Sequence, residues 1–271
     1  MARSIHPSAI VHPEAQLGEG VVIEPFAVIN EGVSLEEGVH IKSHAYIDGH
    51  THIGAGTVVY PGACIGTKTQ DLKYRGETTY VRIGKRCQIR EFVTINASCG
   101  EESSVTIGDG CLIMAYCHVA HNCQLGDQVI MSNNATLAGH ITVESFAIIG
   151  GMTPIHQHVR IGTHAMVGGM SRITHDIPPY MIGGGIPFKY GGVNRVGLSR
   201  RGFGLHDRQQ LMKAFQLLFR KGLKLEEALA TIEAEVEPSR ERDHLLSFCR
   251  TTERGLMGET TRRHRSLVEA G

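Results

Sequence analysis

The residues of this chain best suited to chemistry are four histidines that lie in or beside two series of residues spaced 18 apart. Two neighbouring series have that spacing, namely His121, Gly139 and Gln157, and Asn122, His140 and His158. If the chain returns to the same place at that spacing, each series forms a column, with His118 close by. Imidazole near neutral pH can take a proton from an attacking hydroxyl, and a glycine offers an unobstructed N–H to a developing oxyanion. This chemistry suits acyl transfer.

Histidines also gather for structural reasons, and the chain contains sixteen of them. The residue types alone therefore leave two interpretations open, a catalytic site for acyl transfer or a run of solvated histidines at turns. Stacking at a period of 18 would gather the histidines on one edge, but it does not by itself decide between the two interpretations.

The element that would position these residues is a hexapeptide repeat. From Ile5 to Ile173 in steps of six, 26 of the 29 positions hold an aliphatic residue or methionine, and the three exceptions are acidic. Four residues after each comes a small or aliphatic residue, except at Arg75. One large and one small inward residue per hexapeptide predicts a triangular parallel β-helix in which three hexapeptides form one coil. Because coils stack ~4.8 Å apart, positions separated by three hexapeptides should overlie each other.

The repeat skips twice without losing phase, which predicts two insertions that project from the coils. They span residues 66–80 (GTKTQDLKYRGETTY) and 97–104 (ASCGEESS). Loops that project from a rigid solenoid are frequent places for function.

The seven cysteines are odd in number, and five of them occupy the small inward position of the repeat. This register predicts buried small hydrophobic residues rather than zinc ligands or disulfides. The five are Cys87, Cys99, Cys111, Cys117 and Cys123. Free thiols, with no apolar stretch of signal-peptide length near Met1, predict a cytoplasmic protein.

Charge and hydropathy exclude other classes of protein. Lys plus Arg and Asp plus Glu number 27 each, so the net charge indicates no nucleic-acid or membrane-surface partner. No stretch approaches the ~18 apolar residues of a transmembrane segment. After about residue 183 a glycine-rich passage leads into helical spacing. We therefore expect a β-helix domain at 1–194 and a small C-terminal α-helical domain at 195–271, with helices to about 257 and then a loose polar tail.

Seven segments resemble the UDP-N-acetylglucosamine 3-O-acyltransferases that begin lipid A biosynthesis, and the resemblance covers essentially the whole chain. The segments are QDLKYRGE (70–77), HVAHNC (118–123), NNATLAGH (133–140), IIGGMT (148–153), HQ (156–157), GVN (192–194) and RRGF (200–203). The resemblance implies a left-handed parallel β-helix that transfers an (R)-3-hydroxyacyl chain from acyl-carrier protein to the 3-hydroxyl of UDP-N-acetylglucosamine. It also implies no metal and no bound cofactor, since phosphopantetheine arrives on the carrier protein. The flat faces of the prism add the expectation of a homotrimer.

The resemblance also assigns roles to residues. It implies that His121 is the general base and that the Gly139 N–H is the oxyanion donor. Two residues of the first insertion would hold the substrate across a subunit boundary, namely Asp71 and Lys73. Four more would line the cleft, namely His118, His140, His156 and Gln157. Three match the nucleotide end, where guanidinium groups suit a diphosphate, namely Asn194, Arg200 and Arg201. For the two arginines an ordinary solvated helix start is the alternative.

Two positions depart from the family pattern. Many relatives carry Asp directly after the catalytic histidine, whereas this chain has Asn122. A carboxylate there would make the imidazole more basic, while an amide can only orient the ring. Asn96 stands where relatives often have a histidine that contacts substrate. The contacts to the acceptor are therefore less well defined than the reaction.

Glycine doublets at 150–151 and 168–169 have the same spacing of 18 and predict a strip without side chains, with Gly185 lying over Val167 one coil further on. Such a strip suits either tight corners or an apolar groove for a fatty chain. In the resembling family the position that matches Gly169 sets the chain length. Glycine there predicts a longer donor, such as a 3-hydroxymyristoyl chain, with Met170 as the next candidate for the stop.

Three other functions compete with this one. Zinc carbonic anhydrases of similar fold have a three-histidine zinc site in which two of the ligands lie five residues apart in sequence. No two histidines of this chain have that spacing. An N-acyltransferase of later lipid A synthesis would carry an extra N-terminal domain, whereas the repeat here starts at Ile5. A non-catalytic scaffold would have no need of His121 beside Gly139.

Overall fold

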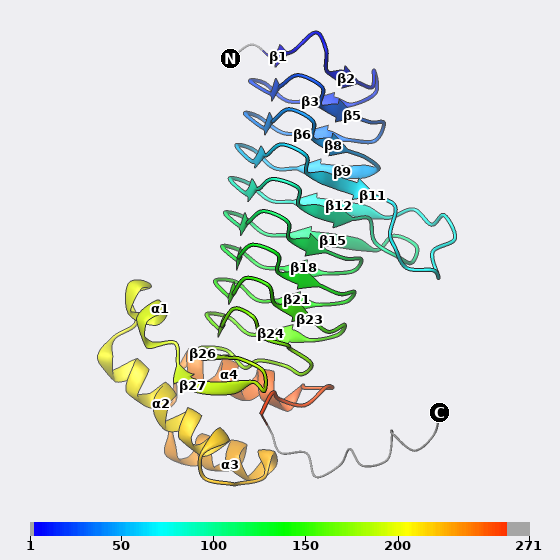
Figure 1. Ribbon diagram of the computed structural model, residues 1–271. Coiled ribbons are helices and arrows are strands. Elements are labelled where there is room, and N and C mark those ends of the chain that lie inside the picture. The colour runs from blue at the N-terminus through cyan, green and yellow to red at the C-terminus, as the bar shows by residue number, and fades with distance from the viewer. Residues whose placement is uncertain (1–2, 259–271) are drawn as a thin grey trace.

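The computed structural model describes residues 3–258, in which short strands wind into a triangular prism of stacked coils (Figure 1). Most strands are two residues long, with the first side chain outward and the second inward. The predicted polar tail at 259–271 lies outside the described residues.

Sheet 1 contains β1 (Ser4–Ile5), β4 (Val22–Ile23), β7 (His40–Ile41), β10 (Val58–Val59), β13 (Gln88–Ile89), β16 (Leu112–Ile113), β19 (Ile130–Met131), β22 (Ile148–Ile149), β25 (Met166–Val167), β26 (Met181–Gly184) and β27 (Lys189–Val193). Sheet 2 contains β2 (Ile10–Val11), β5 (Val28–Ile29), β8 (Tyr46–Ile47), β11 (Cys64–Thr67), β14 (Thr94–Asn96), β17 (His118–Val119), β20 (Thr136–Leu137) and β23 (Pro154–Ile155). Sheet 3 contains β3 (Gln16–Leu17), β6 (Ser34–Leu35), β9 (His50–Ile53), β12 (Tyr80–Ile83), β15 (Ser104–Ile107), β18 (Gln124–Leu125), β21 (Thr142–Val143) and β24 (Arg160–Ile161). Strand pairing is parallel except between β26 and β27.

The strand register confirms the period of 18 and the two insertions. Val119 pairs with Leu137 and Leu137 with Ile155, so each regular coil spans three hexapeptides. Ile65 pairs with Ile95, which adds two hexapeptides to that coil, and Ile95 pairs with Val119, which adds one. Because both excesses are whole multiples of the hexapeptide, the inward phase survives both insertions. In Figure 1 the first insertion projects from the side of the stack after β11.

The last coil departs from the predicted spacing. Val167 pairs with Gly183, so this coil is shorter than three hexapeptides. The prediction that Gly185 lies over Val167 is therefore wrong. Gly185 instead donates its N–H to the Ser171 hydroxyl at 2.8 Å. The chain leaves the regular coil there to form the β26–β27 hairpin.

The interior is filled by the inward columns that the repeat predicts, and their aliphatic side chains are almost wholly buried. Four of the five cysteines assigned to this position are buried as well, namely Cys87, Cys111, Cys117 and Cys123. Cys99 is the exception, because it belongs to the second insertion and is only half-buried. All seven cysteines are free thiols.

Turns join the sheets along three edges of the prism, which we name by the sheets they connect. The 1–2 edge carries Met152 and Met170, the 2–3 edge carries His121, and the 3–1 edge carries Phe146. Many edge residues have a left-handed backbone, and Asn122 is one of them, with φ of 58°. This conformation is costly for most residues but is adopted comparatively easily by asparagine.

The helices of residues 3–258 lie beside and beneath the C-terminal end of the prism, as Figure 1 shows. They are α1 (Arg195–Arg200), α2 (Leu205–Phe219), α3 (Leu225–Glu235) and α4 (Arg240–Arg250). Within the last coil, Arg160 Nε lies 3.0 Å from Asp176 Oδ2, and the Thr252 hydroxyl donates to the same oxygen, which ties the segment after α4 to this coil. Within residues 3–258, no helix has the length and apolar character needed to cross a membrane.

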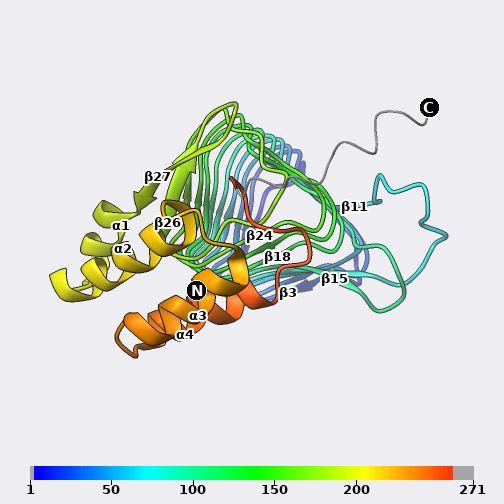
Figure 2. The ribbon, with the colours of Figure 1, turned by 90° about the horizontal axis from the view of Figure 1, so that it is seen from below.

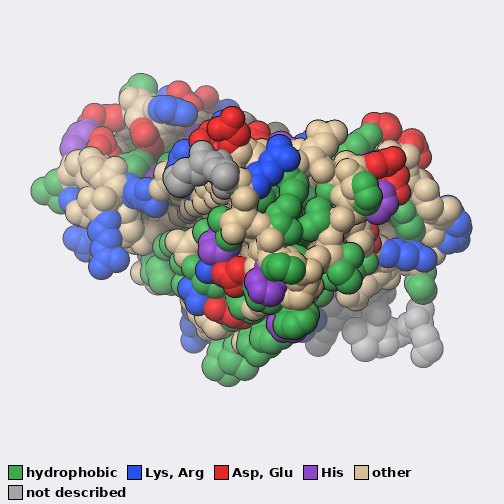
Figure 3. Space-filling view, turned by 90° about the horizontal axis from the view of Figure 1, so that it is seen from above, with side chains coloured by type: hydrophobic (Ala, Val, Ile, Leu, Met, Phe, Trp, Pro, Cys, Tyr) green, Lys and Arg blue, Asp and Glu red, His purple; other side chains and the backbone are tan. Residues whose placement is uncertain are grey.

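The two ends of the prism differ. The view of Figure 2, from the helical end, shows the first insertion projecting at one corner and the helices packed at another side. At the opposite end, seen in Figure 3, hydrophobic side chains are open to solvent. Ile5, an inward residue of the first coil, is 44% exposed, because no preceding described coil covers it.

Candidate active site

The imidazole of His121 lies directly over the backbone of Gly139 on the 2–3 edge. A Cβ built on Gly139 would overlap three atoms of the His121 ring, so any side chain there would displace it. The predicted column therefore brings these two residues into contact. The N–H of Gly139 donates to no acceptor within residues 3–258, whereas its carbonyl accepts from the His158 N–H at 3.2 Å. An open backbone donor thus lies beside an imidazole.

Both nitrogens of His121 face polar partners. Its Nδ1 lies 2.9 Å from Asn122 Oδ1, and its Nε2 lies 3.6 Å from Asp71 Oδ2. The His121 and Asp71 side chains are only 14% and 20% exposed. The first insertion thus folds back onto the coil of its own chain.

Asp71 is held as a carboxylate. The Lys73 N–H donates to Asp71 Oδ1 at 2.8 Å, and this bond, with the charges of His121 and Lys73, keeps the pKa of Asp71 below its ordinary value. A hydrogen bond to the charged form of an acid favours that form. A fixed negative charge therefore stands next to His121 Nε2.

Two imidazoles near His121, those of His118 and His140, have pKa values below the ordinary one. Burial lowers the pKa of His118, whose Nδ1 lies 2.7 Å from the Thr94 hydroxyl. Burial also lowers the pKa of His140, and the neighbouring imidazoles of His158 and His121 add to the effect. The His140 ring lies edge-on to the His121 ring, with 5.1 Å between the ring centroids, and stacks on the His158 ring, with 4.7 Å between the centroids. Because their pKa values are lowered, His118 and His140 provide hydrogen-bonding groups without repelling a protonated His121 as strongly as cations would.

Of the other residues expected at this edge, two are open and one is buried. His156 and Gln157 are both exposed, and His156 Nδ1 lies 3.1 Å from the Gln157 carbonyl. Asn96 is 4% exposed and donates from Nδ2 to the Thr67 hydroxyl at 3.0 Å. Its Oδ1 has no partner among the described residues.

The three residues matched to the nucleotide end lie on a different edge. Arg201 donates to Gln128 Oε1 at 2.6 Å and stacks over Phe146 at 4.7 Å, both on the 3–1 edge. Arg200 is exposed at the end of α1. Asn194 is 5% exposed and caps α1, with its amide bonded to Gly197 and to the carbonyl of His164. A single chain therefore does not bring these residues to His121.

Three residues that bond either His118 or Asn122 are not apparent from the histidine columns. Thr94 bonds His118, while Ser98 and Cys99 bond Asn122. Thr94 pairs with His118 across the coil that carries the second insertion, so correcting the register for that insertion would have placed them side by side. Ser98 and Cys99 belong to the insertion itself, where no periodicity predicts a position.

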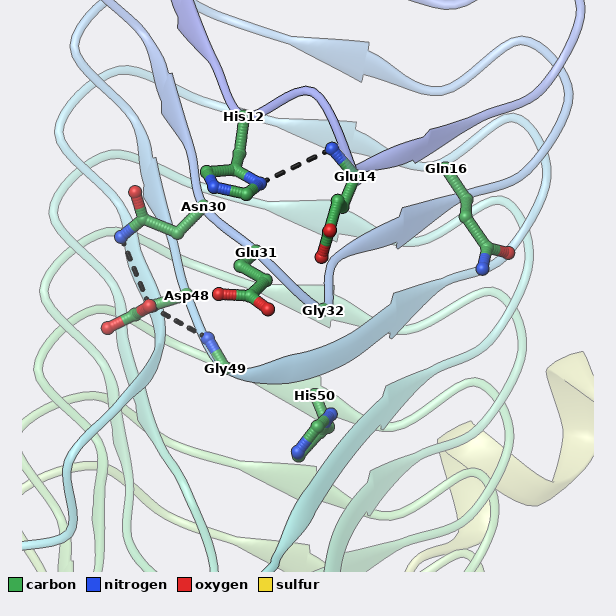
Figure 4. A pocket seen from close by; sticks show the side chains of 9 residues that line it. All are labelled: His12, Glu14, Gln16, Asn30, Glu31, Gly32, Asp48, Gly49 and His50. Carbon is green, nitrogen blue, oxygen red and sulfur yellow. Dashed lines mark hydrogen bonds between the residues drawn. The ribbon is translucent and has the colours of Figure 1, made fainter.

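A separate hollow of about 850 Å³ lies on the 2–3 edge nearer the N-terminus (Figure 4). Its lining includes the carboxylates of Glu14, Glu31 and Asp48, together with His12 and His50. Three carboxylates suit neither a diphosphate nor an apolar acyl chain. The first insertion separates this hollow from His121, since Asp48 and His50 also border the cavity beneath that loop.

Comparison with known proteins agrees with this geometry. Residues 104–139 match the bacterial transferase hexapeptide family, and residues 176–257 match domain 2 of UDP-N-acetylglucosamine O-acyltransferase. The acyl-[acyl-carrier-protein]–UDP-N-acetylglucosamine O-acyltransferase of Chlamydia caviae is 49% identical over 98% of this chain and 99% of its own. That of Paraburkholderia phytofirmans is 48% identical over 93% and 98%. This chain belongs to that acyltransferase family.

Solved structures of the acyltransferase family share the whole fold, a left-handed parallel β-helix. The crystal structure of LpxA, a UDP-N-acetylglucosamine acyltransferase from Bacteroides fragilis, has a TM-score of 0.91 at 39% identity, covering 93% of this chain and 99% of that one. LpxA from Acinetobacter baumannii has a TM-score of 0.90 at 34% identity, with the same coverage.

The glycine strip of this family member lies on the 1–2 edge. A Cβ on Gly150 would overlap the backbone of Gly168 and Gly169, so the two doublets stack as predicted. Gly169 is exposed, and Met152 and Met170 beside the strip are 61% and 68% exposed. A bare backbone flanked by methionines is an apolar surface to which a flexible chain could bind.

Proposed function

We propose that this protein transfers an (R)-3-hydroxyacyl chain from acyl-carrier protein to the 3-hydroxyl of UDP-N-acetylglucosamine, the first step of lipid A biosynthesis. The single observation that carries the proposal is the His121 imidazole lying on Gly139, with Asp71 at Nε2 and Asn122 at Nδ1. The proposal is supported by relatives named acyl-[acyl-carrier-protein]–UDP-N-acetylglucosamine O-acyltransferase. They are 42–51% identical to this chain in alignments that cover most of their length.

His121 acts as the general base in this proposal. Its Nε2 takes the proton of the 3-hydroxyl as the oxygen attacks the thioester carbonyl. The imidazolium that forms is stabilised by the Asp71 carboxylate 3.6 Å away. When the tetrahedral intermediate collapses, the C–S bond breaks and the departing thiolate takes the proton from His121. His121 is thereby returned to its neutral state.

Gly139 supplies the oxyanion donor. Its N–H is open, and it lies beside the imidazole that delivers the nucleophile, so a carbonyl oxygen can reach it as negative charge develops. His118, His140, His156 and Gln157 line the acceptor cleft, and Lys73 adds a positive charge at its rim.

A second copy of the chain completes the site. Arg200 and Arg201 lie on the 3–1 edge and His121 on the 2–3 edge, so a neighbouring prism must bring its arginines to the diphosphate of a substrate at His121. A closed ring of three copies satisfies every site alike. We therefore propose a homotrimer.

The polarity of the prism faces supports this trimer. The outward column of sheet 1 is apolar over five successive strands, namely Leu112, Ile130, Ile148, Met166 and Ile182. The outward column of sheet 3 is polar throughout, namely Gln16, Ser34, His52, Arg82, Thr106, Gln124, Thr142 and Arg160. Large apolar side chains also stand exposed along the 1–2 edge, namely Phe26, Phe92, Tyr116, Met152 and Met170. Sheet 1 and the 1–2 edge would face the neighbours, and sheet 3 the solvent.

The reaction needs no resident cofactor or metal, because the phosphopantetheine thioester arrives on acyl-carrier protein and imidazole supplies the base. Within residues 3–258, no three His, Cys, Asp or Glu side chains are arranged to hold a metal ion. The free thiols fit a reducing compartment, and we propose that the enzyme works in the cytoplasm.

The test is an assay of the purified protein with 3-hydroxyacyl-[acyl-carrier protein] and UDP-N-acetylglucosamine, with the product identified by mass spectrometry. We expect an O-acylated sugar, and His121→Ala should lower the rate by ~10²–10⁴ while the protein stays folded. Activity of the variant within about tenfold of the wild type would exclude His121 as the base. Acylation only of a 3-amino analogue would instead change the acceptor and preserve the reaction class.

A further inference from the structure

Asn122 bridges His121 to the second insertion. On one side its Oδ1 lies 2.9 Å from His121 Nδ1. On the other its amide faces the backbone of Cys99. Its own N–H donates to the hydroxyl of Ser98 at 3.2 Å, and Ser98 is fully buried. The insertion at 97–104 is therefore tied to the histidine without contacting it.

The backbone of Cys99 determines which way the Asn122 amide points. The Cys99 N–H lies 3.3 Å from Oδ1, and the Cys99 carbonyl lies 3.1 Å from Nδ2. A backbone N–H can only donate and a carbonyl can only accept. Turning the amide over would place donor against donor and acceptor against acceptor. The loop therefore keeps Oδ1 toward His121.

This orientation selects one tautomer of His121. Since Oδ1 can only accept, the His121 Nδ1 that faces it must carry the proton. A neutral imidazole has a single N–H, so the lone pair remains on Nε2. That nitrogen is the one directed toward Asp71 and away from the loop. The opposite tautomer would set two acceptors against each other at 2.9 Å, which is closer than the 3.6 Å between Nε2 and the Asp71 carboxylate.

We propose that the second insertion acts through Asn122 as the device that holds His121 in its base-competent tautomer. This inference rests on the proposed role of His121. Asn122 is a positioning residue, since it orients the imidazole and is given no contact with substrate. The insertion is part of the catalytic apparatus although no atom of it takes part in the reaction.

The proposal also explains why asparagine suits this loop better than aspartate. An aspartate could accept from His121 and from the Cys99 N–H. Its second oxygen would then face the Cys99 carbonyl at about the 3.1 Å now spanned by a hydrogen bond. Two acceptors at that separation repel each other, so the loop would loosen while the imidazole gained a carboxylate partner.

Two variants at this position should move the pH–rate profile in opposite directions. Asn122→Ala removes an acceptor that stabilises the imidazolium, so the acidic limb of kcat/KM moves to lower pH. Without Asn122 neither tautomer of His121 is favoured, so kcat should fall by ~10–100-fold while KM for the acceptor changes little.

Asn122→Asp should move the acidic limb to higher pH, and backbone amides in 97–104 should exchange hydrogen faster. Arg86→Ala, at an exposed edge residue that also has a positive φ (53°), is the control for backbone strain.

A direct view of the proton separates this inference from the proposed function. Neutron diffraction from wild-type crystals at roughly pH 8, above the ordinary imidazole pKa, should show deuterium on His121 Nδ1 and none on Nε2. Deuterium on Nε2 would overturn the inference whatever the activity. So would an unchanged pH profile and a kcat within about threefold of wild type for Asn122→Ala. A fully active His121→Ala would instead reject the base assigned under the proposed function.

Discussion

Gly139 is the residue whose identity follows most directly from its surroundings. Its backbone φ needs no glycine, since it lies outside the left-handed region. The restriction comes from the His121 ring, which occupies the space where a Cβ would stand. The absence of a side chain at this glycine therefore has two effects: it leaves room for the imidazole, and it leaves the backbone N–H accessible.

Replacing Gly139 by alanine should disable the site without unfolding the protein. The added methyl group displaces the imidazole, and a misplacement of about 1 Å costs on the order of 10²-fold in rate. Gly191→Ala is the matched control, because a Cβ there would meet nothing closer than 3.7 Å. Steady-state kinetics and thermal unfolding of both variants test this expectation. A Gly139→Ala enzyme as fast as the control would show that the ring can move without consequence.

At the scale of elements, the glycine strip of the 1–2 edge should set the length of the acyl chain. Gly169→Met fills the strip, and the preferred donor should become shorter, since each methylene that can no longer be buried forfeits ~0.8 kcal/mol. A Cβ on Gly169 would lie 3.1 Å from the Gly151 carbonyl oxygen, so Gly169→Ala tests the local strain alone. Rates with a series of 3-hydroxyacyl donors provide the measurement. An unchanged ranking would transfer the role to Met170.

The regular elements could be predicted from the sequence because each hexapeptide carries its own inward pair. That pattern locates the coils, the in-phase insertions and the contact of His121 with Gly139. It fails where the repeat stops constraining the backbone. The repeat misplaces Gly185 because the last coil is shorter than the others, and it misplaces Cys99 because that residue lies in an insertion.

The inserted loops hold the part of the site that periodicity cannot reach. Asp71 contacts His121 of its own chain, and the Cys99 carbonyl accepts a hydrogen bond from Asn122. Both contacts depend on the folded path of each loop. Such contacts have no fixed spacing in sequence. Resemblance to relatives could assign Asp71 a role, but it could not indicate that Asn122 joins the base to the second insertion.

At the scale of the whole molecule, stability should fall in mild acid. Burial lowers the pKa values of His118, His140 and His164. As pH drops through the unfolded imidazole value of ~6.5, the unfolded chain takes up protons first, so the folded state loses relative stability from there downward. Above that value the contribution is fully present.

Thermal unfolding between roughly pH 8 and pH 5.5, a range that brackets the imidazole pKa, measures this effect. The midpoint should decrease toward the acid end. His164→Asn should show a shallower decrease, because asparagine tolerates the φ of 54° at this position and does not titrate. A wild-type midpoint that is constant across this range would contradict the prediction.

Because every pair of neighbouring coils repeats the same parallel register, the prism has translational symmetry along its axis. Val22 pairs with Ser4 on one side and with His40 on the other, so removal of residues 22–39 would let Ser4 pair with His40. The shortened chain should fold and keep its catalytic rate, since the contacts at His121 lie on later coils and depend only on their immediate neighbours. Deletion of 22–30, half a coil, breaks the hexapeptide phase and should prevent folding of the first coils. The number of coils that precede the active site should therefore not matter to it. The site depends only on the coils that contact its residues.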